Sequence, residues 1–267
     1  MKTVIIIPAR YASARYPGKP LVALRDGTGG KKTLIQRSWE AAVAVSGVDA
    51  VYVATDDDRI REAAEGFGAE VIMTSEACGN GTERCADAVE RAGLEADLVV
   101  NLQGDSPLTP AWFVEDLIKA MQERPDMDMA TPVLRCDAQT YAHFTADRKA
   151  GRVGGTTAVF DGANRALYFS KEVLPYIDPN KAENAAGEVF HHVGLYAYRP
   201  AALRQYAGWP EGRLERHEGL EQLRFLEHGV PVLCVEVEGK GRVFWELNNP
   251  EDVARIESIL MQDGSPA

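Results

Sequence analysis

This sequence of 267 residues contains no long hydrophobic run. The apolar stretch at residues 4–7 is too short to cross a bilayer. Only a few apolar or neutral residues separate Lys2 from Pro8, so the first residues do not form the core of a signal peptide. We therefore expect a cytoplasmic protein that has no membrane partner.

Cysteine and histidine are also scarce, with four and five residues. No two cysteines have the close CxxC spacing of a zinc or redox site, so we expect buried, reduced thiols. His191 and His192 are adjacent, and adjacent residues on a strand face opposite sides. These two side chains therefore cannot easily share one metal ion.

Positive charge is in deficit, because 29 Lys and Arg residues stand against 40 Asp and Glu residues, a formal net charge of −11. An acidic surface repels nucleic acid and anionic membranes, so we expect no nucleic-acid partner. A few clustered Arg and Lys residues can still form a pocket for a small anion. The composition therefore argues against a nucleic-acid or membrane partner but does not exclude a small anionic ligand.

Two common nucleotide-binding motifs are missing. No GxGxxG sequence follows the first apolar run, which argues against a dinucleotide site of the Rossmann type. The Gly-rich stretch at residues 27–33 has Lys32 at the position where a P-loop needs Ser or Thr, and no strand leads into it. We interpret this stretch as a flexible hairpin.

Short apolar strands alternate with amphipathic helices in the first half of the chain, which predicts a parallel sheet with helices on both faces. The predicted strands are 3–9, 50–55, 70–73 and 98–103, and the predicted helices are 33–46, 82–92 and those starting near Arg59 and Pro110. In the second half, antiparallel strands are predicted at 156–160, 166–169 and 193–198, followed by a helix at 214–228, a strand at 232–237 and a helix at 250–261.

Three motifs carry candidate chemistry. The loop at residues 8–21 follows the first strand and contains Arg10, Arg15 and Lys19, a set of cations that suits a polyphosphate, although a solvated basic loop is the alternative. Asp105 ends the fourth strand, where an acid can hold Mg²⁺ against phosphate oxygens or simply form a turn. In the third motif, at residues 79–84, Gly81 permits close backbone approach and Thr82 is a candidate helix cap.

Together these motifs resemble the 3-deoxy-manno-octulosonate (Kdo) cytidylyltransferases, also called CMP-Kdo synthetases. The matching segments are, in order, PARYASARYPGKPL from Pro8, VATDDDRI from Val53, GTER from Gly81, NLQGD from Asn101, ALYFSK from Ala166, HHVGLYAYR from His191, LEQLRFLEHG from Leu220 and NPEDV from Asn249. The resemblance covers nearly the whole chain.

The resemblance implies an α/β, Rossmann-like nucleotidyltransferase (nucleotide-diphospho-sugar transferase) fold. Its mostly parallel central sheet carries a β-rich excursion used for dimerisation and for the sugar site. It implies one domain over residues 1–267, with 1–130 mainly binding CTP and 131–267 mainly binding the sugar and forming a homodimer. The implied reaction is Mg²⁺-dependent transfer of CMP from CTP to the anomeric hydroxyl of Kdo or a related acidic sugar. Pyrophosphate leaves, and the product serves lipopolysaccharide or surface-polysaccharide synthesis.

The resemblance also implies roles for residues of this chain. Arg10, Lys19 and Asp105 would be catalytic, with Asp105 and the residue at position 248, Asn248, beside the metal. The residues implied to bind the nucleotide are Pro8, Ala9, Arg10, Arg15, Lys19, Thr82, Arg84 and Gln103. Those implied to surround the sugar are Lys171, His192, Tyr196, Glu221 and Gln222.

The chain departs from the family pattern where the sugar and the metal should meet. Ser106 stands where Glu is usual, Lys171 where Arg is usual, and Asn248 where the family has an Asp ligand to the metal. The strand at residues 155–159 reads GTTAV where a VKVV run is usual. Lys keeps a positive charge but loses the bidentate fork of Arg.

These departures leave the identity of the acceptor open. Kdo, an amino-substituted Kdo and a nine-carbon ulosonic acid are all candidates. Two further alternatives are a transferase that acts on a nucleotide-sugar and a nucleotide-binding protein without turnover.

Overall fold

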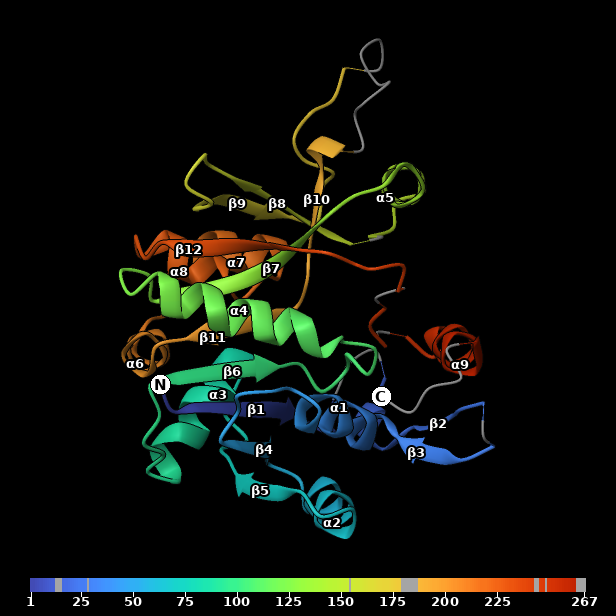
Figure 1. The fold of residues 1–267 in the computed structure, drawn as a ribbon, viewed down its shortest axis with the longest axis vertical. Helices are drawn as coiled ribbons and strands as arrows, with labels where there is room; N and C mark the ends of the chain where they lie inside the picture. The colour runs from blue at the N-terminus through green and yellow to red at the C-terminus, as the bar shows by residue number, and fades with distance from the viewer. Residues whose placement is uncertain are drawn as a thin grey trace. The chain divides into compact units, whose positions relative to one another are not determined.

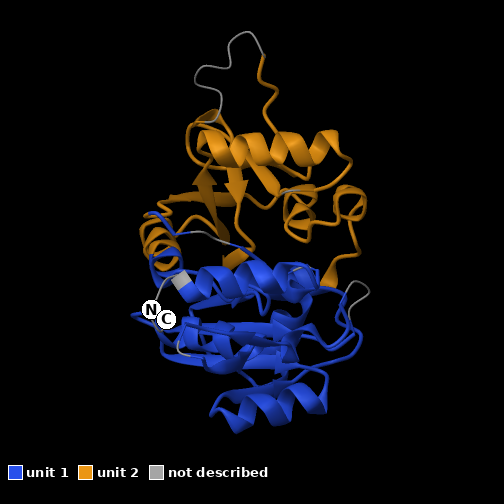
Figure 2. Ribbon diagram, turned by 90° about the vertical axis from the view of Figure 1, so that its right-hand side faces the viewer, with its two compact units in different colours: residues 1–115, 198–207, 241–267 blue, residues 116–197, 208–240 orange. Residues whose placement is uncertain are grey.

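The computed structural model describes residues 1–12, 16–27, 29–153, 155–178, 187–242, 245–247 and 249–262. The chain divides into two compact units, coloured separately in Figure 2. Unit 1 consists of Met1–Glu115, Tyr198–Ala207 and Gly241–Ala267, and unit 2 of Asp116–Ala197 and Gly208–Lys240. The chain therefore passes between the units several times.

Unit 1 is built on parallel strands in the order β5-β4-β1-β6 (Figure 1). Their bounds are Thr3–Ala9 for β1, Ala50–Thr55 for β4, Glu70–Met73 for β5 and Leu98–Leu102 for β6. All residues of β1 and β6 are buried, as the apolar composition of these two strands requires in a sheet covered on both faces. The four strands predicted from the sequence are confirmed, with the last one residue shorter.

Helices cover this sheet: α1 (Leu34–Val43) and α3 (Gly81–Arg91) pack on β1, and α2 (Asp58–Gly66) packs on β4 and β5. The side chain of Asp57 caps α2 by accepting a hydrogen bond from the backbone N–H of Arg59. The prediction that Thr82 caps α3 is wrong, because Asn80 is the cap and accepts a hydrogen bond from the N–H of Glu83 at 2.8 Å.

The remaining elements of unit 1 lie outside this sheet. A short 3₁₀ turn, η1, covers Lys19–Leu21, and β2 (Ala23–Arg25) pairs with β3 (Lys31–Thr33) in a hairpin. This hairpin contains the Gly-rich stretch that the sequence predicted as a hairpin. Near the chain end, α9 (Asp252–Gln262) packs on β2. Two further helices, α4 (Ala111–Glu123) and α6 (Pro200–Gly208), each have residues in both units.

Unit 2 contains the β-rich part of the chain. Its antiparallel ladder runs β7-β10-β8-β9, and β12 joins β7 in parallel. The bounds are Met129–Arg135 for β7, Thr156–Phe160 for β8, Ala166–Ser170 for β9, Phe190–His192 for β10 and Val232–Val237 for β12. Leu195–Tyr198 forms β11, and Ala138–Lys149 forms α5. Sequence patterns did not predict β7 or α5; β7 contains Pro132, a residue that normally argues against a strand.

The helix predicted at 214–228 is wrong as a single element. The structure has two short helices there, α7 (Arg213–Glu218) and α8 (Leu223–Glu227). Gly219 ends α7 in the left-handed region with φ +63°, and its N–H bonds to the carbonyl oxygen of Glu215 at 2.6 Å. Because glycine adopts this conformation without steric cost, it ends the helix there.

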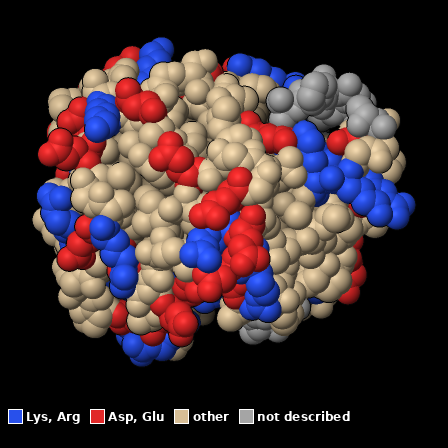
Figure 3. Space-filling view, turned by 90° about the horizontal axis from the view of Figure 1, so that it is seen from below, with Lys and Arg blue, Asp and Glu red and all other residues tan. Residues whose placement is uncertain are grey.

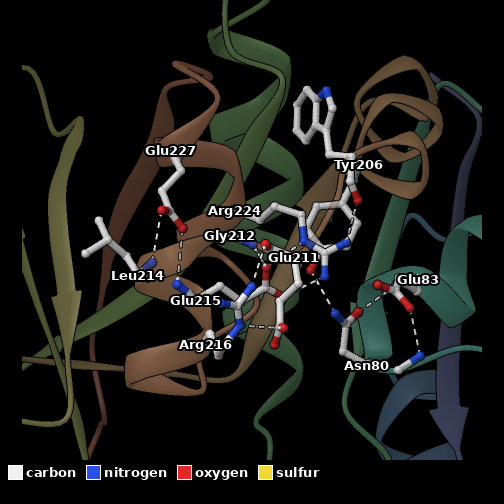
Figure 4. A network of polar contacts seen from close by, with 12 residues as sticks. Asn80, Glu83, Tyr206, Glu211, Gly212, Leu214, Glu215, Arg216, Arg224 and Glu227 are labelled. Carbon is white, nitrogen blue, oxygen red and sulfur yellow. Dashed lines mark hydrogen bonds and ion pairs between the residues drawn. The ribbon is translucent and has the colours of Figure 1, made fainter.

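A buried ion pair joins these two helices (Figure 4). Arg224 donates from Nε and Nη2 to the two oxygens of Glu215, at 2.6 and 2.7 Å. Glu227 accepts the backbone N–H groups of Leu214 and Glu215 at the start of α7. The bidentate geometry and the satisfied helix start hold α7 and α8 as one rigid block.

Acidic and basic side chains are interspersed over the face of the molecule shown in Figure 3. Such mixing matches the exposed pairs that the structure records, for example Arg61 with Asp58 at 3.1 Å and Arg216 with Glu211 at 3.1 Å. Exposed pairs of this kind contribute little to stability. Among the helices of the described residues, none has the length and apolar character needed to cross a bilayer.

Candidate functional site

The cationic loop after β1 is closed by its own backbone. Gly18, in the left-handed region with φ +71°, donates its N–H to the carbonyl oxygen of Tyr11 at 2.9 Å. A Cβ atom at position 18 would lie 3.1 Å from the Tyr11 ring, so both the conformation and the space favour glycine. Arg59, from α2, stacks on the same ring with its guanidinium carbon 3.3 Å from the ring centroid. The loop closure places Lys19 at the start of η1.

Lys19 and Asp105 form an ion pair. The Lys19 Nζ lies 2.6 Å from Oδ2 of Asp105, and the two side chains are 16% and 24% exposed. Asp105 lies three residues beyond β6, which pairs in parallel with β1. The loop after β1 and the residues after β6 therefore start at the same edge of the sheet, where open α/β sheets bind ligands.

Arg10 is a loop cation whose residue is exposed at the surface. Its Nη1 donates to the carbonyl oxygen of Gly79 at 3.3 Å. This contact joins the first candidate motif to the third. Arg15, the other cation predicted in the loop, lies outside the described residues.

The side chains of Pro8 and Gln103 both lie close to Gly81. A Cβ atom added at Gly81 would lie 2.9 Å from Nε2 of Gln103 and 3.3 Å from Cγ of Pro8. Only glycine fits between them without displacing a neighbour. Ala9 follows Pro8 in the chain, ends β1 and is buried.

Thr82 and Arg84 are buried and used by the fold. The Thr82 hydroxyl shares a 2.7 Å hydrogen bond with the Tyr198 hydroxyl, and Thr82 is fully buried. Arg84 is 2% exposed and donates to Thr74 Oγ1 at 2.5 Å and to Asp56 Oδ2 at 2.9 Å. Sequence reasoning assigned both residues to the nucleotide and missed these internal partners. Their contact with the nucleotide stays a prediction.

The metal prediction concerns Asp105 and Asn248. Asn248 lies outside the described residues. Leu247, just before it in the chain, is fully buried and donates its N–H to the carbonyl oxygen of Asp105 at 2.9 Å. No group of three or more His, Cys, Asp or Glu side chains suited to a metal occurs among the described residues. Mg²⁺ needs no such group, because it binds through one or two carboxylates together with phosphate oxygens and water.

Three of the residues implied to bind the sugar are brought together in unit 2. The rings of His192 and Tyr196 lie 5.6 Å apart, and the Tyr196 hydroxyl donates to Oε1 of Gln222 at 3.2 Å. Gln222 is 1% exposed, and its Nε2 has no hydrogen-bond partner among the described residues. His192 Nε2 lies 3.0 Å from Oγ1 of Thr131. Thr131 had no recognisable signal in the sequence, because threonine is ordinary in a strand.

Lys171 and Glu221 complete the set. Lys171 directly follows β9, and its backbone N–H donates to Oε2 of Glu218 at 2.9 Å. Glu221 lies partly buried in the segment between α7 and α8. Glu218 was missed by sequence reasoning, because an acid at the end of a short helix looks like a solvated surface residue.

Comparison with known proteins places this chain clearly. It matches the cytidylyltransferase family over residues 4–236. It is 41% identical to 3-deoxy-manno-octulosonate cytidylyltransferase from Maricaulis maris, covering 99% of both chains. It is 39% identical to 8-amino-3,8-dideoxy-manno-octulosonate cytidylyltransferase from Shewanella sediminis, covering 98% of this chain and 100% of that one.

A solved structure agrees. CMP:2-keto-3-deoxy-manno-octonic acid synthetase in complex with CTP superposes with a TM-score of 0.83 at 35% identity, covering 98% of this chain and 100% of the other. The fold and site thus define an α/β nucleotidyltransferase. The chain belongs to the cytidylyltransferase family and, within it, to the CMP-Kdo synthetases.

The buried histidines predict acid sensitivity. Burial, with a smaller contribution from neighbouring His191, lowers the pKa of His192 to about 3 from 6.5. Above pH 6.5 the folded and unfolded states both hold this ring neutral. Below pH 6.5 only the unfolded state takes up the proton, so stability falls as the pH falls toward the folded-state pKa. Between pH 7.5 and pH 5 the loss is about 2 kcal/mol for this residue.

Urea unfolding of the wild type and of His192→Gln at both pH values measures this loss. We expect the variant to lose about 2 kcal/mol less than the wild type on acidification. The same change at His217, which is exposed, is the matched control. An identical pH dependence in all three proteins would contradict the burial of a neutral His192.

Proposed function

We propose that this protein transfers CMP from CTP to the anomeric hydroxyl of Kdo or its 8-amino analogue, with release of pyrophosphate. The observation that carries the proposal is the ion pair between Lys19 and Asp105, a candidate phosphate-binding cation and a candidate metal ligand, in the loops that follow the paired strands β1 and β6. The similarity over 98% of the chain to a synthetase complexed with CTP supports the same nucleotide. We further propose a cytoplasmic, Mg²⁺-dependent homodimer that serves lipopolysaccharide precursor synthesis.

In this proposal the cations of unit 1 bind the triphosphate. Arg10, which is exposed, and Lys19, at the start of η1, would neutralise the phosphates that leave as pyrophosphate. Nucleotidyl transfer needs positioning and charge neutralisation more than covalent participation by the protein. Arg15 would add a third cation, and Pro8, Ala9, Thr82, Arg84 and Gln103 would line the nucleoside pocket.

Asp105 would hold the Mg²⁺. The bound ion supplies Lewis-acid stabilisation of charge on the phosphate oxygens. Asp105 is at present neutralised by Lys19 at 2.6 Å, so an incoming metal–triphosphate would separate the pair. Lys19 would then exchange a carboxylate for a phosphate, and Asp105 would exchange an ammonium for the metal. Each group would have an oppositely charged partner both before and after the exchange, which favours it.

The acceptor would bind to unit 2. Lys171 offers a cation for the carboxylate of the acidic sugar, and the Nε2 donor of Gln222 offers a hydrogen bond to a sugar hydroxyl. His192, Tyr196 and Glu221 would complete the surroundings. Because the relatives include enzymes named for Kdo and for 8-amino-Kdo, both sugars are candidates for this chain.

A pyrophosphate-release assay tests the proposal. We expect release only when CTP, Mg²⁺ and Kdo or 8-amino-Kdo are present together. Omission of each component, replacement of CTP by UTP, ATP or GTP, and a nine-carbon ulosonic acid are the controls. Calorimetric binding of CTP without release for any sugar would contradict turnover. Release from a nucleotide-sugar in place of CTP would contradict the nucleotide assignment.

Lys19→Ala should lower kcat by roughly two to four orders of magnitude, the scale of losing a charge-stabilising contact in the transition state. Lys32→Ala is the matched control, because Lys32 also pairs with a carboxylate in unit 1, Glu40, at 2.8 Å, but lies on the hairpin strand β3. The control should retain wild-type kcat. Equal turnover by the two variants would remove Lys19 from the mechanism.

Asn248→Asp should lower the Mg²⁺ concentration needed for half-maximal rate, because a second carboxylate beside the cation binds it more tightly. The preceding residue, Leu247, donates its backbone N–H to the backbone carbonyl oxygen of Asp105, the proposed metal ligand. Mg²⁺ titrations with Kdo and with 8-amino-Kdo measure the effect, and Asp105→Asn should abolish activity. An unchanged Mg²⁺ requirement combined with a changed preference between the sugars would show that position 248 selects the acceptor instead.

A further inference from the structure

The side chain of Lys171 is partly buried. Among the described residues, no carboxylate lies within 4.0 Å of its ammonium group, although most Arg and Lys side chains around it in sequence are paired, such as Arg148 and Arg165. A lysine that loses hydration without gaining a partner is costly unless an anionic ligand supplies one. This cation is therefore prepared to receive an anion.

Three donors fix the carboxylate of Glu218 next to this lysine. Its Oε2 accepts the backbone N–H of Lys171 at 2.9 Å. Its Oε1 accepts the hydroxyl of Ser170 at 2.7 Å and that of Tyr168 at 3.3 Å. Ser170, the last residue of β9, is 2% exposed, so its hydrogen bond to the Glu218 carboxylate is buried. Glu218 thus sets the point at which the Lys171 side chain leaves the backbone.

Gly219 provides the space for the other end of the same side chain. A Cβ atom built at Gly219 would lie 2.9 Å from Nζ of Lys171, closer than carbon and nitrogen normally approach. The Lys171 ammonium therefore lies where the side chain of any other residue at position 219 would begin. The backbone at Gly219 has φ +63°, so the glycine is also the helix-ending residue of α7.

The base of this arrangement is rigid. Residues Glu218 and Gly219 end α7, which the buried pair of Glu215 with Arg224 joins to α8 (Figure 4). Glu227 satisfies the N–H groups at the other end of α7. A carboxylate and a glycine on such a block determine a position more sharply than the same residues on a loop would.

We infer that Glu218 and Gly219 are positioning residues that set the location of the Lys171 ammonium and so determine how strongly, and for which acidic sugar, the acceptor carboxylate is bound. This inference deepens the proposed function and rests on it for the identity of the anion. Lysine is a point charge on a flexible stem, so its recognition of a carboxylate depends on what confines the stem. Here Glu218 fixes the backbone nitrogen of Lys171, and Gly219 leaves room for its Nζ atom.

Two glycines offer a matched test. Gly229 follows α8 with φ +73°, and a Cβ atom there would meet nothing within 4 Å. Gly219→Ala and Gly229→Ala therefore share the strain of a left-handed alanine, but only the first displaces the Lys171 ammonium. We expect Gly219→Ala to raise KM for the acceptor roughly tenfold, the effect of weakening one charge-assisted contact, and to leave KM for CTP unchanged. Gly229→Ala should change neither constant.

Glu218→Gln gives a second, nearly isosteric test. The amide keeps an acceptor for Ser170 and Tyr168 but presents an NH₂ group to the N–H of Lys171, so it should also raise KM for the acceptor and not KM for CTP. Unfolding midpoints show whether the variants remain folded under the assay conditions. If Gly219→Ala and Gly229→Ala have the same kinetic constants in an active enzyme, the inference is overturned and the proposed function stands.

A readout without turnover separates the two proposals. NMR of ¹³C-dimethylated lysines, with the Lys171 signal identified by its loss in Lys171→Arg, reports the surroundings of this ammonium directly. The signal should move in Gly219→Ala and Glu218→Gln, stay in Gly229→Ala, and shift when Kdo is added. Movement with Kdo in a protein that releases no pyrophosphate would overturn the proposed function but support the inference. A signal that none of the variants or Kdo displaces would overturn the inference.

Discussion

Parallel pairing of β1 with β6 is the constraint on which the nucleotide site depends. Ile6 of β1 is in register with Asn101 of β6, so both strands end at one edge of the sheet. The chain after β1 returns through Gly18 to Lys19, and the chain after β6 continues to Asp105. A cation and an acid that are 86 positions apart in sequence thereby meet at 2.6 Å. The apolar cores of the two strands have no chemical role, but they determine where the chemistry occurs.

Sequence patterns predicted the elements that rest on local composition. Strands at 50–55, 70–73, 156–160 and 232–237 have the predicted bounds, because each is a short run of β-favouring residues between turn residues. The failures lie where tertiary contacts override local preference. The strand β7 tolerates Pro132, and its carbonyl oxygen accepts the N–H of Val193. The predicted helix at 214–228 is interrupted at Gly219, because the backbone of this residue is left-handed and ends α7 before α8 begins.

The candidate site was predictable to a similar extent. The loop cations and Asp105 could be chosen because strand ends in open sheets collect functional residues. The hydrogen-bond partners of Thr82 and Arg84 could not be predicted from the spacing of these residues in the sequence. One bonds to Tyr198 and the other to Thr74 and Asp56, and a single sequence does not reveal which side chains satisfy one another inside a core. Glu218 could not be chosen for the same reason, because its donors belong to β9 and to the residue that follows this strand, 47 to 50 positions away.

The two lysines of the proposed sites show two ways in which an acidic protein can present a positive charge. Lys19 is held by a carboxylate, so its charge is nearly cancelled until a ligand or metal separates the pair. Lys171 is positioned by the hydrogen bond from its backbone N–H to Glu218, and its ammonium lies over Gly219, which has no side chain. Its charge therefore has no carboxylate partner among the described residues. The first arrangement suits a substrate that arrives with its own cation, because metal and triphosphate can each replace one member of the pair. The second suits a substrate with a single carboxylate and no accompanying cation, since nothing has to be displaced before it binds.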